Sequence, residues 1–349
     1  MMAVSGEVMC IWYSTSIGEV KSSLLFMKYN TKIGDIFARS HKMLIAIAFA
    51  SVFFHMAKAI QANAYYGTRS GMWKSGMGIL LVMYGVSYAG CILPWTVLSP
   101  TLYIMVQTIF DTYVGGWAIF MLLGGEKIPL SILARTLIAH ILLSCVGFIL
   151  LIYHIRMVHF GASSINKQML WPTNERPLWM PDELTKELYL LYTFFFFFFF
   201  IVYRKAASWG SSYISLYKFY YGGATNWNNL PPSIEPEWYF WIFYFALASA
   251  SSLSGGLLRI VVLFALLGGL PLIKEMQCLR SVDTVEHSSL NSALSFSFLV
   301  VFLIFFNRSK GSWWHAYFLD AFLLSLVFFE ILLLSINAEL VIAQSKINK

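Results

Sequence analysis

The chain has 349 residues, of which 58% are hydrophobic and 12% are charged, and its formal net charge at pH 7 is +7. Soluble domains carry about 25% charged residues, so this composition excludes an ordinary soluble protein and predicts a polytopic membrane protein. The positive charge does not indicate nucleic-acid binding, because most Lys and Arg residues lie between the apolar stretches, where they suit lipid headgroups.

Apolar stretches of about 20 residues are long enough to cross a membrane as helices. Before the first of them, residues 20–41 combine spaced apolar residues with lysines, which predicts a helix lying on the membrane surface. Interfacial helices are expected between residues 98 and 131. We predict seven or eight spanning helices, with room for a break in the longest stretch. The stretches cover residues 42–62, 76–98, 132–155, 187–203, 238–273, 288–306 and 316–336.

Four histidines lie in two of these stretches at one repeated interval. His41 and His55 are fourteen residues apart, and so are His140 and His154. Fourteen residues make about 3.9 helical turns, so the two histidines of each stretch share a face at two heights. A single such histidine is most often a hydrogen-bonded core residue, but four at matched spacing indicate two stacked ligand sites, since unpaired imidazole in hydrocarbon is costly. One span intervenes, so the helices run parallel, pairing His41 with His140 and His55 with His154.

Two glycines and two cations accompany the histidines. Gly76 and Gly90 are also fourteen residues apart, in the stretch between the two histidine-bearing stretches. A helix with glycines there can let a flat macrocycle lie against its backbone, although close helix packing explains them equally well. Lys58 and Arg135 lie near histidines, where they could pair with acidic groups of a bound ligand. For Lys58, snorkelling to the membrane surface is the alternative.

A carboxylate lies between a proline and two aromatic residues at the start of a later apolar stretch. Pro236 precedes Glu237, which is followed by Trp238 and Tyr239. Aromatic residues at a membrane boundary are ordinary, but a glutamate among them is not, and it could accept and release a proton. The four cysteines are scattered without a CxxC or CxxCH motif, so they indicate neither a zinc site, an iron–sulfur cluster nor covalently attached heme.

These motifs resemble cytochrome b, the membrane core of the mitochondrial or respiratory cytochrome bc complex (complex III). The resemblance rests on both histidine pairs, the two glycines, GCILPW at 90–95, GG at 124–125 with Arg135, and PEWY at 236–239. It implies an all-α polytopic membrane protein. The expected parts are an N-terminal diheme four-helix bundle over 1–160, its first helix truncated, and a C-terminal membrane domain over 161–349 with three or four helices and the PEWY quinol-site loop.

The resemblance also implies a role for each site residue. His41 and His140 would be axial ligands of one b heme, and His55 and His154 of another, with Gly76, Gly90, Arg135 and Lys58 beside the cofactors. Glu237 and Tyr244 would act in quinol oxidation, in a pocket formed with Pro236, Trp238 and Tyr239. His159, Ser163, Lys186 and Glu187 match the quinone-reduction site, where Lys-Asp is usual in the family.

The implied function is that of the cytochrome b subunit of ubiquinol:cytochrome c oxidoreductase. It would transfer electrons across the membrane through two b hemes, between the quinol-oxidation and quinone-reduction sites, with coupled proton translocation. Implied partners are a Rieske iron–sulfur protein, a membrane-anchored c-type cytochrome, other complex III subunits, a second copy of the complex and lipids, in the mitochondrial inner membrane. A heme-free transporter with proton-relaying histidines, or an assembly scaffold, is the alternative; acidic residues inside the spans would favour a transporter.

The sequence departs from the family pattern at several positions. SGEVMCIWY matches only the last turns of the family's first helix, with Gly6 at a helix glycine, so that helix is lost, supplied by another chain or missed at the start. WTVLS stands where W-G-Q-M-S is usual, and Ala248 and Lys58 replace arginines. These changes concern the shape of the quinol-oxidation pocket and the surroundings of one heme.

Overall fold

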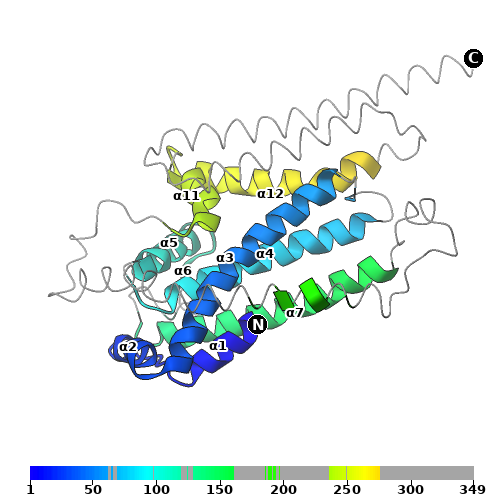
Figure 1. Ribbon diagram of the computed structural model, residues 1–349. Coiled ribbons are helices and arrows are strands. Elements are labelled where there is room, and N and C mark those ends of the chain that lie inside the picture. The colour runs from blue at the N-terminus through cyan, green and yellow to red at the C-terminus, as the bar shows by residue number, and fades with distance from the viewer. Residues whose placement is uncertain are drawn as a thin grey trace, which may run out of the picture. The chain divides into compact units, whose positions relative to one another are not determined.

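The computed structural model describes residues 1–160 apart from short gaps between 62 and 128, isolated residues between 185 and 196, and residues 236–275 apart from 249. Within these ranges the chain is helical and contains no strand, which confirms the predicted all-α class. The helices are α1 (Met2–Cys10), α2 (Val20–Asn30), α3 (Lys32–Gln61), α4 (Ser70–Ile92), α5 (Leu98–Tyr113), α6 (Gly116–Ala118), α7 (Ile132–Phe160), the 3-10 helix η6 (Trp238–Phe240), α11 (Trp241–Ala248) and α12 (Leu253–Glu275) (Figure 1).

Four of the described helices are long and apolar enough to cross a membrane. They are Lys32–Ile60, Ser70–Ile92, Ile132–Val158 and Leu253–Pro271. Each corresponds to a predicted stretch, and α5 supplies a shorter helix in the connection where interfacial helices were expected. The stretches predicted at 288–306 and 316–336 lie outside the described residues, as does most of 187–203.

The first spanning helix starts earlier than the apolar stretch. α3 begins at Lys32, after Thr31 has separated it from α2 with an extended backbone (φ −127°, ψ 114°). In its first turns Arg39 donates from Nε to the carboxylate of Asp35 at 2.9 Å. Such an i,i+4 ion pair stabilises helix in a polar segment. The surface helix predicted over 20–41 is therefore α2 together with the first turns of α3.

The chain divides into two compact units, and α3, α4 and α7 contribute to both. The first unit includes Met1–Ile47 and Val82–Gly147, and the second includes Ala48–Leu81, Phe148–Ala162 and the described residues after Glu235. The boundary between the units separates the two histidines of each fourteen-residue interval, so the first unit holds His41 and His140 and the second holds His55 and His154.

The core of the first unit forms around the turn after α4. Tyr103 is fully buried with Val20, Ile132 and Leu133, and Trp95 packs against this cluster. Trp95 follows a proline and has a φ of +48°, a left-handed conformation that is uncommon for a bulky residue. The left-handed residue ends the helical run at the LPW motif, so α4 ends before residue 98, where the apolar stretch alone predicted its end.

In the second unit, the predicted break in 238–273 lies between α11 and α12. α11 ends at Ala248 and α12 begins at Leu253. A Cβ on Gly256 would lie 2.9 Å from the Cα of Leu247 and 3.0 Å from the carbonyl oxygen of Ala246. Only glycine lets the first turn of α12 approach the backbone of α11 this closely.

A tryptophan on α4 compensates for a proline in α12. Pro271 has no N–H, so the carbonyl of Leu267, four residues earlier, lacks its usual helical donor. The buried indole Nε1–H of Trp73 donates to that carbonyl at 2.8 Å. The ring of Tyr65 packs edge-on against Trp73, with centroids 5.8 Å apart. The hydrogen bond therefore ties α12 to α4 at the position where α12 is weakest.

We expect Trp73→Phe to lower the free energy of unfolding by about 1–3 kcal/mol, because it leaves the Leu267 carbonyl without a donor in apolar surroundings. Thermal unfolding in detergent, followed by circular dichroism, measures the effect. Pro271→Ala restores a helical donor, so the cost of Trp73→Phe should fall in that background. An equal cost in both backgrounds would show that indole packing, not the hydrogen bond, matters. Trp117→Phe, at a tryptophan that is 67% exposed, is the matched control.

Candidate functional site

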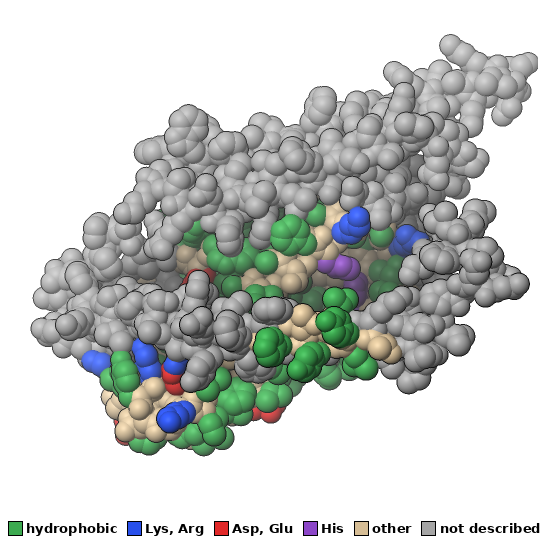
Figure 2. Space-filling view, in the orientation of Figure 1, with side chains coloured by type: hydrophobic (Ala, Val, Ile, Leu, Met, Phe, Trp, Pro, Cys, Tyr) green, Lys and Arg blue, Asp and Glu red, His purple; other side chains and the backbone are tan. Residues whose placement is uncertain are grey.

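The structure brings the four histidines together as two pairs. In the first unit, His41 of α3 faces His140 of α7, with ring centroids 6.3 Å apart and planes at 63°. In the second unit, His55 of α3 faces His154 of α7, with centroids 6.4 Å apart and planes at 80°. These are the pairs expected from parallel helices. On the face shown in Figure 2, histidine side chains are visible in a hollowed part of the surface, close to Lys and Arg side chains.

The distance within each pair fits one metal ion held between two imidazoles. When two imidazole nitrogens bind a metal from opposite sides at about 2 Å each, the ring centres lie about 6.4 Å apart. The observed separations are 6.3 and 6.4 Å. Among the described residues no group of three or more His, Cys, Asp or Glu side chains could hold a metal ion. A metal bound here therefore needs its remaining ligands from a cofactor, as in heme with two axial histidines.

Backbone carbonyls fix the orientation of the first pair. Nδ1 of His140 donates to the carbonyl of Val86 at 2.8 Å, and Nδ1 of His41 lies 3.1 Å from the carbonyl of Met2. A carbonyl can only accept, so the proton is on Nδ1 and Nε2 is left with a free lone pair. That tautomer is the one a histidine needs in order to bind a metal through Nε2.

Two serines that the sequence analysis missed also contact these rings. The Oγ of Ser5 lies 2.9 Å from Nδ1 of His41, and the Oγ of Ser75 lies 2.8 Å from Nδ1 of His154. Each serine directly precedes a glycine in an M-x-x-S-G sequence, and this repeat was the available signal. His55 differs: it is exposed and has no hydrogen-bond partner among the described residues.

The glycines lie directly against the histidine rings. A Cβ at Gly90 would be 3.1 Å from Cε1 of His140, and one at Gly76 would be 3.4 Å from Cε1 of His154. At Gly6 the corresponding distance, to Cε1 of His41, is 3.5 Å. The absence of a side chain at Gly90 thus lets the His140 ring approach the backbone of α4 more closely than a Cβ would allow, whereas a Cβ at Gly76 or Gly6 would make an ordinary contact. This is a third reason for Gly90 beside macrocycle contact and helix packing.

The two predicted cations lie on the same helices as the histidines. Arg135 is exposed in the first turn of α7, and its guanidinium lies against Gly124, where a Cβ would be 3.2 Å from Nε. Gly124 has a φ of +94°, which favours glycine. Burial raises the pKa of Tyr103, and the positive charge of Arg135 acts in the opposite direction. Lys58 is exposed on α3, one turn after the second histidine.

The PEWY segment packs on the aromatic face of α3. The ring of Tyr239 stacks on Phe49, with centroids 4.5 Å apart and planes at 6°. Trp238 lies against Phe53 at 6.4 Å. The indole of Trp241 closes the segment by donating to the carbonyl of Pro236 at 3.0 Å. Phe49 and Phe53 lie between the two histidines of α3, so this packing holds the segment next to the histidine-bearing helix.

Glu237 and Tyr244 are both half-buried in this part of the second unit. Glu237 is extended (φ −60°, ψ 149°) just before η6, and its carbonyl accepts from the N–H of Phe240 at 2.8 Å. The ring of Tyr244 lies on α11, 5.2 Å from that of Phe245. The backbone of Glu237 is therefore fixed by η6.

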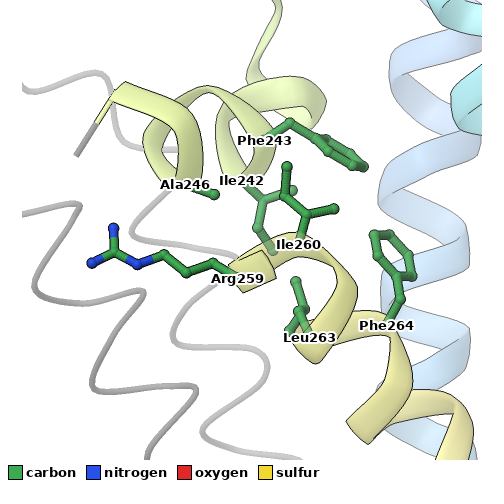
Figure 3. A pocket seen from close by; sticks show the side chains of 7 residues that line it. All are labelled: Ile242, Phe243, Ala246, Arg259, Ile260, Leu263 and Phe264. Carbon is green, nitrogen blue, oxygen red and sulfur yellow. The ribbon is translucent and has the colours of Figure 1, made fainter. Parts of the chain in front are cut away.

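The seam between α11 and α12 shows a shallow hollow (Figure 3). Phe243 and Phe264 stack across it with centroids 5.8 Å apart, and Arg259 extends away from both rings. The hollow has no internal space for a water molecule, so it is a packed contact rather than a binding cavity. Its lining residues are Ile242, Phe243, Ala246, Arg259, Ile260, Leu263 and Phe264.

The residues predicted for quinone reduction lie almost entirely outside the described residues. His159 is in the last turn of α7, but its side chain is not described. Ser163, Lys186 and Glu187 lie outside the described ranges, so their roles stay predictions.

Comparison with known proteins identifies the family. The family described as Cytochrome b(N-terminal)/b6/petB matches residues 46–212, and Cytochrome b(C-terminal)/b6/petD matches residues 224–329. The chain belongs to the cytochrome b family. Membership in this family implies heme b binding and the role of a membrane subunit in an oxidoreductase complex, as the sequence predicted.

Individual relatives agree with this assignment. Cytochrome b of Acanthamoeba castellanii is 25% identical over 269 residues, covering 75% of this chain and 68% of that protein. Cytochrome b of Neurospora crassa is 23% identical over 308 residues, covering 86% of this chain and 76% of that one. A chain of the structure titled Hyperthermophilic respiratory Complex III has the same fold, with a TM-score of 0.72 and 20% identity over 95% of this chain and 86% of that chain.

We expect the three glycine-to-alanine substitutions to differ in severity in the order of their ring distances. Gly90→Ala places a methyl group 3.1 Å from Cε1 of His140 and forces that ring to move. Gly76→Ala and Gly6→Ala create contacts of 3.4 and 3.5 Å, which are ordinary. Heme content and reduced-minus-oxidised spectra of the purified variants measure the effect. Equal heme loss in all three would indicate that contact with the macrocycle, rather than with histidine, requires the glycines.

Proposed function

We propose that this chain is the cytochrome b subunit of a ubiquinol:cytochrome c oxidoreductase. It would carry electrons across the membrane between a quinol-oxidation and a quinone-reduction site, with coupled proton translocation. The observation that carries the proposal is the matched pair of histidine separations, 6.3 and 6.4 Å, on the same two helices. Heme b bound there supplies reversible one-electron transfer, and two histidine ligands leave no iron position open for oxygen.

In this proposal each unit holds one heme b. His41 and His140 would hold the heme in the first unit, and His55 and His154 would hold the heme in the second. The Nδ1 hydrogen bonds of His41, His140 and His154 fix the tautomer and orientation of those three rings. Arg135 and Lys58 supply positive charge for the carboxylates of the cofactors. Gly76 leaves room beside the imidazole of His154, and Gly90 leaves room beside that of His140.

Quinol oxidation is proposed at the PEWY segment. Glu237 accepts a proton from the bound quinol, and Tyr244 positions the quinol ring. Packing of Trp238 and Tyr239 on α3 supports this role, because it fixes the glutamate backbone beside a histidine-bearing helix. Pro236 stiffens the approach to the segment. The competing explanation is that Glu237 only orders the loop.

Quinone reduction is proposed near the C-terminal end of α7, beyond His154. His159, with Lys186 and Glu187, would hold and protonate the quinone oxygens, and Ser163 would orient the ring. The sequence position of His159, five residues after His154 on α7, supports this assignment. Ubiquinone and ubiquinol are thus substrate and product at two separate sites.

The proposed partners follow from what the chain lacks in its sequence. Its cysteines have no spacing for an iron–sulfur cluster, so one electron from quinol would leave to a mobile Rieske partner and then to a membrane-anchored c-type cytochrome. The other electron would enter the heme held by His41 and His140. The fold shared with a chain of a respiratory Complex III supports assembly with further subunits. We propose that the complex is a dimer and lies in the mitochondrial inner membrane. A heme-free transporter or scaffold is the other candidate, and heme content separates the two.

Two b hemes per chain are expected in the purified complex by pyridine hemochrome analysis. His41→Ala and His140→Ala should both remove the heme of the first unit. His55→Ala and His154→Ala should both remove the heme of the second unit. His159→Ala is the matched control, because it changes a histidine of α7 that is not proposed as a ligand. One heme per chain, or none, would contradict the assignment.

Glu237→Gln should slow quinol oxidation by about 10²-fold, because it keeps the shape and hydrogen-bonding capacity of the side chain but removes the titratable group. A carboxylate can accept the proton and an amide cannot, so the variant should be slow and its pH profile should differ from that of the wild type. Steady-state quinol oxidation across pH measures both. Glu7→Gln, at an exposed carboxylate, is the control. Full activity with an unchanged pH profile would leave Glu237 as a loop-ordering residue only.

A further inference from the structure

Three residues of α1, which are Met2, Ser5 and Gly6, contact the ring of His41. The hydroxyl of Ser5 donates to the carbonyl of Met2 at 2.8 Å, and its Oγ lies 2.9 Å from Nδ1 of His41. The Met2 carbonyl is itself 3.1 Å from the same Nδ1, and Gly6 lies against Cε1. The hydroxyl hydrogen is used by Met2, so Nδ1–H is the donor to Ser5 Oγ. Ser5 is 1% exposed, which shields these bonds from water.

Ser75 repeats this arrangement on another helix, at a histidine of the other pair. Its hydroxyl donates to the carbonyl of Met72 at 2.9 Å, and its Oγ lies 2.8 Å from Nδ1 of His154. The Met72 carbonyl also contacts His154, and Gly76 lies against Cε1. The sequences MAVSG and MWKSG therefore form one local structure twice, once for each histidine pair.

A third position has the same backbone arrangement without the hydroxyl. The carbonyl of Val86 accepts from Nδ1 of His140 at 2.8 Å, and Gly90 lies against Cε1. The residue before this glycine is Ala89, which is buried. The carbonyl and the glycine alone are thus enough to orient a histidine. The serine adds a second acceptor to an N–H that already has one.

We propose that Ser5 and Ser75 are positioning residues that set the reduction potential of the two hemes, one serine for each heme. This inference rests on the proposed heme ligation. A hydroxyl that donates to a carbonyl is polarised, and its oxygen accepts more strongly from Nδ1–H. A more strongly held N–H makes the imidazole a better electron donor to iron, which stabilises the ferric state and lowers the potential.

Ser5→Ala should raise the midpoint potential of the heme held by His41 and His140, and Ser75→Ala should raise that of the other heme. We expect a three- to tenfold change in the reduction equilibrium constant, which is about 28–59 mV for one electron. Redox titration of the purified complex, followed optically, measures both potentials. The electron paramagnetic resonance signal of the ferric hemes reports ligand orientation independently of activity.

Ser5→Thr and Ser75→Thr keep the hydroxyl and should keep wild-type potentials. Ala89→Ser adds the missing hydroxyl beside His140 and should lower the potential of the heme that Ser5→Ala raises. Loss of heme in an alanine variant alone, with heme retained in its threonine variant, would also support the hydroxyl's role.

Full heme content with both potentials unchanged in Ser5→Ala and Ser75→Ala would overturn the proposal. Heme loss in both the alanine and the threonine variants would overturn it as well, because the hydroxyl would then not be the property that matters. Wild-type protein without two hemes would instead refute the proposed function, so the two failures are distinguishable.

Discussion

The rest of the structure depends on one interaction, the hydrogen bond from a histidine Nδ1 to the backbone of a neighbouring helix. An unpaired imidazole N–H in apolar surroundings is costly, so a buried ring needs an acceptor. Three of the four rings have one, and His55, which has none among the described residues, is exposed. A helical carbonyl keeps a second lone pair, but a ring reaches it only where a nearby side chain is absent. For His140 the acceptor is the carbonyl of Val86, and the residue without a side chain is Gly90, four residues later. This constraint forces α4 against α7 at its glycines.

The same constraint divides the surface of α3 between two partners. On an ideal helix, with about 100° per residue, His55 lies about 40° from His41 on one side, whereas Phe49 and Phe53 lie about 80° and 120° away on the other. The histidine face meets α7, and the aromatic face meets the PEWY segment through Tyr239. One helix can therefore serve the proposed heme sites and the proposed quinol site without competition between them.

Periodicity made the histidine pairs and the glycines beside them predictable, because each fourteen-residue interval lies within a single helix. The break before α12 was predictable from the length of the apolar stretch at 238–273. The start of α3 at Lys32 was missed because hydropathy counts apolar residues, whereas the Asp35–Arg39 pair continues the helix through a polar segment. Ser5 and Ser75 were missed for a different reason. A serine in an apolar helix is unremarkable, and their histidine partners are 36 and 79 residues away in the sequence.

One turn of α4 connects the fold of the second unit to the pair formed by His55 and His154. Trp73 donates to the Leu267 carbonyl that Pro271 leaves without a donor, and two residues later Ser75 contacts His154. Residues two apart on a helix point about 200° from each other, so the turn faces α12 on one side and α7 on the other. Because a packed core shifts between discrete arrangements rather than deforming smoothly, loss of the contact to α12 would also move the acceptor of His154. The position of that imidazole is therefore set in part by a hydrogen bond on the opposite face of α4.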